Sequence, residues 1–117
     1  MSAEAILIGF LNEHGTIPAY GDVPATRPSA FITLERTGGQ HTRVVDEGTF
    51  AVQVWAASRA EAMLSADETA DLLITAPALV DAVASLAVLS VYNFPDPDSG
   101  TPRYQLTVTA VVMPAVD

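Results

Sequence analysis

Residues 30–56, AFITLERTGGQHTRVVDEGTFAVQVWA, decide the fold of this chain. Apolar and polar side chains alternate at both ends of the stretch, in Ala30–Arg36 and in Thr49–Ala56, and this alternation is typical of strands buried on one face. The residues between them, Thr37–Gly48, are polar and include two adjacent glycines, a composition typical of a hairpin loop. The stretch therefore predicts two antiparallel strands joined by a long polar loop.

Helical signals flank this predicted hairpin. A serine cap and apolar residues at helical spacing predict a first helix over residues 2–14. Ser58 and Glu61 form a capping-box pattern, which opens a second helix that we expect to end near Thr75. A proline then stops or resets that helix, and the following ALVDAVA (residues 78–84) predicts one or two further helical turns.

Further strands complete the sheet. A short edge strand is expected near Ile17–Tyr20, among prolines that confine it to an edge. The β-rich runs Val88–Phe94 and Tyr104–Met113 predict a second hairpin, joined by PDPDSGTPR. The order of elements predicts one α+β domain over residues 1–117, with a mostly antiparallel four- to five-stranded sheet and two main helices packed on one face.

The composition excludes several kinds of chemistry. The chain has 117 residues, a net charge of −9 and no cysteine, and all of its basic residues are arginine. Without cysteine there is no disulfide, thiolate metal site or thiol nucleophile, and without lysine there is no Schiff base and no Walker-type phosphate loop. The excess of acid argues against a protein that binds the phosphate backbone of nucleic acid.

Reactive side chains are few. His14 lies at a predicted helix end, where an imidazole commonly caps the helix, and His41 lies in the glycine-rich loop without a serine elbow beside it. Asp96 and Asp98 could belong to a metal loop, but the spacing to Gly100 favours a tight turn. We therefore expect no catalytic residue, no cofactor and no metal site, and a protein that is not an enzyme.

Trp55 and two arginines point instead to surface contacts. Trp55 shares a strand face with Gln53, out of phase with the apolar positions, so it either packs under a helix or anchors an interface. Arg36 and Arg43 flank the polar loop of an otherwise acidic chain, a position that suits ion pairs between subunits as well as local ones.

Three segments follow the first helix in a characteristic order. They are TRPSAFITLERTGG (26–39), TFAVQVWAASRAEAMLSADETADLL (49–73) and FPDPDSGTPRYQLTVTAVV (94–112). In this order they resemble the tail terminator proteins of long-tailed (siphovirus) bacteriophages, particularly those of actinobacterial hosts. The resemblance covers nearly the whole chain.

The resemblance implies a structural role in the virion. Tail terminators are small proteins that form hexameric rings on the head-proximal end of the tail tube, stop its polymerisation and present the docking surface for the head connector. The implied partners are further copies of this chain, the tail tube protein and the head–tail connector protein, with no membrane and no cofactor. Genomic DNA would pass through the ring without specific binding, and a net acidic lumen would let it slide. The implied location is the neck of the virion, after assembly in the host cytoplasm.

We expect the loop Thr37–Gly48 and neighbouring strands to contact another subunit or the tube. The alternatives are another head–tail joining or minor tail protein, a small ligand- or metal-binding domain, and an acidic DNA mimic, for which the scattered acids provide no obvious phosphate-like array. The ligand- or metal-binding alternative would use Asp96, Asp98 and Arg103. The candidate interface residues are Arg36, Gly38, Gly39, Gln40, His41, Arg43, Asp46, Glu47, Trp55, Arg59, Asp96, Asp98 and Arg103.

Overall fold

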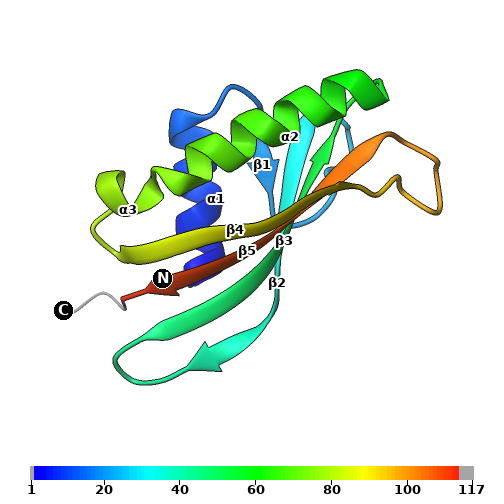
Figure 1. Ribbon diagram of the computed structural model, residues 1–117. Helices are drawn as coiled ribbons and strands as arrows, with labels where there is room; N and C mark the ends of the chain where they lie inside the picture. Colours follow the sequence, from blue (N-terminus) through cyan, green and yellow to red (C-terminus); the bar gives the residue numbers. More distant parts are fainter. Residues whose placement is uncertain (1, 114–117) are drawn as a thin grey trace.

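The computed structural model describes residues 2–113 and confirms the α+β class (Figure 1). One five-stranded mixed sheet has the strand order β1-β2-β3-β5-β4, in which β1 and β2 are parallel and all other neighbours are antiparallel. The elements are α1 (Ala3–His14), β1 (Ala19–Tyr20), β2 (Phe31–His41), β3 (Asp46–Trp55), α2 (Arg59–Ile74), α3 (Ala76–Leu79), β4 (Val83–Asn93) and β5 (Arg103–Val112).

The hydrophobic core lies between the sheet and the helices. The central strand β3 directs Phe50, Val52 and Val54 to this side, and all three are fully buried. Leu7 of α1 and Leu73 of α2 are also fully buried in the same cluster, so both long helices cover one face of the sheet, as predicted. No helix within residues 2–113 is long and apolar enough to cross a membrane.

Serine side chains begin both long helices. Ser2 Oγ accepts a hydrogen bond from the Ala5 N–H at 3.2 Å, and Ser58 Oγ accepts one from the Glu61 N–H at 3.2 Å. Each bond satisfies a backbone donor that the first helical turn would otherwise leave unpaired. The serine caps predicted from the sequence are therefore confirmed.

The prediction of a long loop over Thr37–Gly48 is wrong. Both strands of the hairpin continue through it, with Gly39 opposite Gly48 and His41 opposite Asp46. Only residues 42–45 form the turn, closed by a hydrogen bond of 2.8 Å from the Thr42 N–H to the Val45 carbonyl. Most side chains in this part of β2 are exposed, so its sequence has no need of the apolar alternation that marks a half-buried strand. Without that alternation the sequence of the segment predicts a loop.

The helical turns predicted for residues 78–84 are also only partly present. α3 ends at Leu79, and β4 begins at Val83, well before the expected Val88. Val83 is buried and pairs with Val112 of β5. Packing of this strand against the core therefore overrides the helical propensity of its alanines.

Two glycines permit the hairpin to bend. Gly39 has φ of +107°, and a Cβ there would lie 2.0 Å from the Glu47 carbonyl oxygen. Its partner across the strands, Gly48, lies under the ring of Phe50, which would be 2.4 Å from an added Cβ. The register also shifts between Arg36 and Gly38, a bulge that increases the local twist.

Replacing Gly39 by Ala should lower the free energy of unfolding by about 2 kcal/mol or more, because the new methyl group meets backbone at a strained φ. Gly38→Ala is the matched control, since a Cβ at Gly38 meets nothing within 4 Å, and we expect no loss of stability there. Urea unfolding of both variants measures the difference. Equal losses at the two positions would contradict the role given to Gly39.

Candidate assembly surface

An ion pair braces the β2–β3 hairpin. Arg36 Nη1 lies 2.7 Å from Asp46 Oδ1 and donates a hydrogen bond of 2.8 Å to Asp46 Oδ2. Arg36 Nε also donates to the Gly38 carbonyl at 3.0 Å. Asp46 is only 7% exposed, and a carboxylate this buried depends on its charged partner. Of the two uses considered for Arg36, the structure shows the local ion pair.

The tip of the hairpin is free of such contacts. Val44 is 66% exposed, Arg43 is exposed, and Arg43 forms no ion pair within residues 2–113. Figure 1 shows the hairpin reaching past the helices. It brings together most of the predicted interface residues, namely Arg36, Gly38, Gly39, Gln40, His41, Arg43, Asp46 and Glu47.

A second group of predicted residues lies at the other end of the sheet. The Arg103 guanidinium lies 4.8 Å from the centroid of the Trp55 ring, and its Nη1 lies 3.9 Å from Asp96 Oδ1. Arg103 Nε also donates to the Phe94 carbonyl at 2.9 Å, and Arg103 is only 6% exposed. Since Asp46 and Trp55 occupy the two ends of β3, about 30 Å of strand separates the two groups. Apart from Arg59, the predicted residues therefore form two separate clusters, and Trp55 and Arg103 of the second cluster are buried.

Trp55 lies on the face of the sheet that the helices leave open. Its ring stacks on Phe31 at a centroid distance of 5.2 Å, and Arg27 lies 5.3 Å from its centroid. Trp55 is only 3% exposed. The alternative in which Trp55 packs under a helix is wrong, because Trp55 and Phe31 pair on the opposite face. Within this chain Trp55 belongs to a small second core.

Side-chain hydrogen bonds run from Trp55 across four strands of the open face. The indole N–H donates to Thr33 Oγ1 at 3.0 Å, and Thr33 donates to Gln53 Oε1 at 3.0 Å. Gln53 donates to Gln105 Oε1 at 3.0 Å, and Gln105 donates to the Tyr92 hydroxyl at 2.7 Å. Such chains strengthen cooperatively and fix their members in place. We call these five residues the polar row.

The polar row could not be found from the sequence alone. Alternation places Thr33, Gln53 and Gln105 on the polar face of their strands. Contact between them depends on β5 lying beside β3 in a register that puts Gln53 opposite Gln105. The sequence carries no signal for that register, because the two strands are far apart along the chain.

Asp96 holds the turn between β4 and β5, as the composition of this segment predicts. Its carboxylate accepts hydrogen bonds from the side chain and the backbone of Ser99, and its carbonyl accepts one of 2.8 Å from the Gly100 N–H. The pKa of Asp96 is lowered below 3.8, mainly by the hydrogen bond from the Ser99 hydroxyl. Desolvation opposes this lowering, while the backbone N–H groups of Asp98 and Ser99 and the charge of Arg103 add to it.

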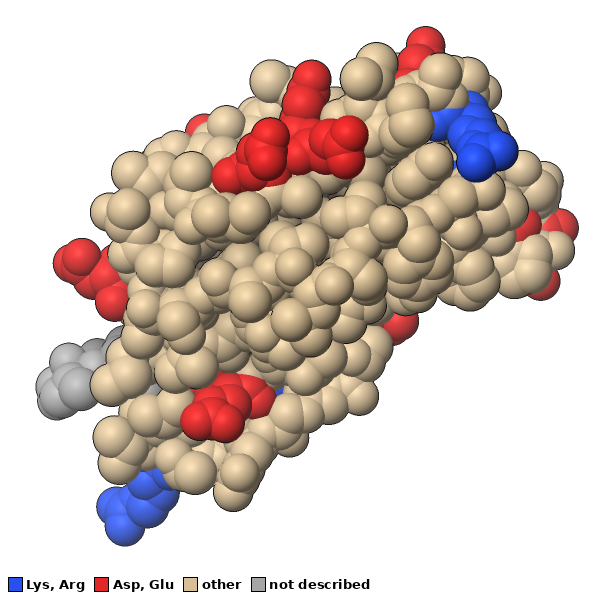
Figure 2. Space-filling model, in the orientation of Figure 1, with Lys and Arg blue, Asp and Glu red and all other residues tan. Residues whose placement is uncertain are grey.

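Arg59 and the acidic residues of α2 lie apart from both groups. Arg59 is exposed at the first residue of α2, and Figure 2 shows acidic side chains gathered over this helix. No three residues of the His, Cys, Asp or Glu types come together within residues 2–113 in a way that could hold a metal ion. The exposed acidic residues of α2 are Glu61, Asp67, Glu68 and Asp71.

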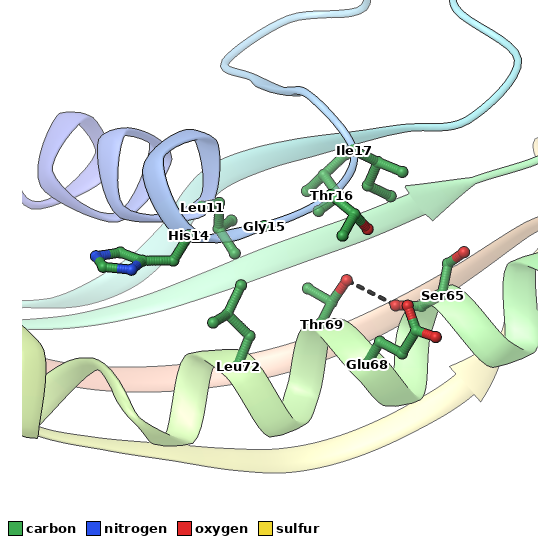
Figure 3. Close-up of a pocket in the computed structure, with 10 residues that line it drawn as sticks. Leu11, His14, Gly15, Thr16, Ile17, Ser65, Glu68, Thr69 and Leu72 are labelled. Carbon is green, nitrogen blue, oxygen red and sulfur yellow. Dashed lines mark hydrogen bonds between the residues drawn. The ribbon is translucent and has the colours of Figure 1, made fainter.

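A small pocket opens between the end of α1 and the middle of α2 (Figure 3). Its volume of about 160 Å³ is below the range of typical ligand pockets, about 300–1,000 Å³. In Figure 3 the His14 ring and the Glu68 carboxylate lie at opposite ends of the lining and do not converge. Thr69 is already engaged, since its hydroxyl donates to the Ser65 carbonyl at 2.7 Å. The lining offers no set of side chains aimed at one reacting atom.

No protein-family model matches this sequence, and comparison with curated proteins finds no match either.

Replacing Gln53 by Leu should lower the free energy of unfolding by about 1–3 kcal/mol, because it removes the acceptor of Thr33 and the donor to Gln105. Thr107→Val is the control, since Thr107 lies on the same face and outside the polar row. Urea unfolding with tryptophan fluorescence reports both stability and the surroundings of Trp55. A Gln53→Leu variant as stable as the control would contradict a structural role for the row.

Replacing Ser99 by Ala should raise the pKa of Asp96 towards 3.8, because it removes the main hydrogen bond to the carboxylate. A lowered pKa means that Asp96 stabilises the fold above the pKa of the unfolded chain and loses this effect as the pH falls through the folded value. The variant should therefore lose less stability on acidification. An NMR titration of the Asp96 carboxyl carbon measures the shift, with Ser90→Ala as control; an unchanged pKa in Ser99→Ala would contradict this assignment.

Proposed function

We propose that this chain is a tail terminator of a long-tailed bacteriophage. Copies of it form a closed ring on the head-proximal end of the tail tube, stop further addition of tube protein and present a docking surface for the head connector. The protein acts through its surfaces, without a cofactor, at the neck of the virion.

The observation that carries this proposal is the projecting β2–β3 hairpin. It occupies the segment in which the resemblance to tail terminators leads us to expect contacts with a neighbour or the tube. The Arg36–Asp46 ion pair ties β2 to the first residue of β3, directly after the turn, and the turn itself exposes Arg43 and Val44. A hairpin held by an ion pair beside its turn and exposed at the turn itself suits docking against another protein, because little conformational entropy remains to be lost on binding.

The charge of the chain supports the passage of DNA through such a ring. The net charge is −9, and two of the five arginines are already engaged within the chain, Arg36 with Asp46 and Arg103 near Asp96. Few cations are left to neutralise phosphates, so DNA would meet a surface that does not hold it.

Two measurements test the proposal. Light scattering with negative-stain imaging should find an annular particle with the mass of six 12.3-kDa chains, either free or on tube ends. Mixed with the tail tube protein of the same virus, the wild-type chain should end tube growth and give tubes of bounded length. Tubes that grow equally long with and without the wild-type chain would refute the proposal.

Replacing Arg43 and Val44 by Ser should leave the fold intact and abolish capping, because both side chains are exposed at the tip. Val23→Ser, at another exposed valine, is the control and should cap normally. Tube lengths measured by electron microscopy, together with circular dichroism of each variant, separate lost docking from lost folding. Normal capping by the Arg43/Val44 variant would show that the tip is not the docking element.

A further inference from the structure

The outer edge of β4 is open along the strand. β4 ends the strand order of the sheet, so only its inner side is paired, with β5. Its sequence, VASLAVLSVYN, has no charged residue and no proline, the residues that commonly protect an edge from pairing. Register shifts around Ala84 and Leu89 interrupt the strand, and the regular run Ser85–Val88 between them remains available to a further strand.

Exposed apolar side chains gather around this edge. In Figure 1, α2 and α3 run alongside β4, and in Figure 2 an uncharged band crosses the molecule below the acidic side chains of α2. Exposed large hydrophobic side chains on neighbouring elements are typical of contact sites between proteins. Most of the exposed large hydrophobic residues belong to α2, α3, β4 and the residue that follows β4, namely Met63, Leu64, Ile74, Leu79, Leu89, Val91, Tyr92 and Phe94.

The same sheet has a complementary free edge on its other side. β1 pairs only with Ile32 and Thr33 of β2, so the outer edge of β2 is unpaired over residues 34–41 within the described chain. Successive antiparallel pairings from β2 through β3 and β5 make β2 antiparallel to β4. A second copy placed beside β4 in the same orientation therefore presents β2 in the antiparallel direction, which continues the ladder.

Charges at the two edges complement each other in this arrangement. Asp46 pairs with Val112, and Val112 pairs with Val83, so the hairpin tip and the start of β4 lie at the same end of the sheet. Exposed Asp81 lies two residues before β4, and exposed Asp71 lies in the last turn of α2, which has no basic residue. The exposed cation of a neighbouring hairpin, Arg43, would meet these carboxylates and the negative end of the helix dipole.

We propose that a second copy of this chain pairs the outer edge of its β2 with β4, antiparallel, and places its Arg43 beside Asp71 and Asp81. Each copy then uses β4 on one side and β2 on the other. Such a head-to-tail contact closes into a ring when the repeated rotation returns to its start. The inference rests on the self-assembly in the proposed function and names the surfaces that carry it.

Cross-linking between single cysteine variants tests this contact, because the chain has no cysteine of its own. Ala87→Cys marks β4 and Gln40→Cys marks the free edge of β2, and both positions are exposed. Each variant is treated with a short bismaleimide alone and in an equal mixture, with and without tube protein. Glu13→Cys, whose side chain is 77% exposed on α1, measures random collisions.

A cross-linked product of two 12.3-kDa chains should form in the mixture well above the Glu13→Cys background, and neither variant alone should exceed that background. Dimers from Ala87→Cys alone would overturn the inference in favour of a symmetric β4–β4 contact. No mixed product, with or without tube protein, would overturn a second copy as the occupant of β4.

A charge exchange provides an independent readout. Arg43→Asp in the Gln40→Cys chain should lower the yield of mixed product several-fold, and Asp71→Arg with Asp81→Arg in the Ala87→Cys chain should restore it. A yield indifferent to these changes would overturn the placement of Arg43. Mixed product without tube capping would refute the proposed function and support this contact. Tube capping without mixed product would support the proposed function and overturn this contact.

Discussion

The ten-residue strand β3 is paired along its whole length on both sides, and the rest of the structure depends on that constraint. Since side chains alternate along a strand, placing Phe50, Val52 and Val54 under the helices obliges Gln53 and Trp55 to point to the other face. The helices cover only one face. Polar and aromatic side chains on the other face therefore need hydrogen-bond partners and packing contacts from within the sheet and its loops, because no helix covers that face.

The two ends of the sheet differ in how the side chains of this face are accommodated. Near the end of β3, Phe31 and Arg103 enclose Trp55, and a row of hydrogen bonds joins the strands. At the hairpin end the chain instead leaves the core, and Gly39 and Gly48 let the strands approach and bend where side chains would collide. One end of the sheet is consequently closed by its own side chains, and the other leaves Arg43 and Val44 exposed.

The sequence was a good guide wherever a local pattern had a local cause. Alternation in β2 and β3 and the two serine caps predicted the fold class and the starts of both long helices. It failed where distant segments decide the outcome. The exposed hairpin is predicted as a loop because only its partner strand keeps it extended, and the start of β4 is predicted as helix because its pairing with β5 is not visible in the sequence. The sequence also could not show that the candidate residues divide into two clusters, because their separation depends on the length of β3, which lies between them.

The indole of Trp55 also sets the polarity of a distant edge. An indole N–H can only donate, so Thr33 Oγ1 accepts from it and donates its own hydrogen bond to Gln53, and each later bond follows in the same direction. The row ends at the hydroxyl of Tyr92, which accepts from Gln105 and keeps its own proton for an outside acceptor. A buried residue on β3 thereby fixes the direction of hydrogen bonds as far as the exposed Tyr92 of β4.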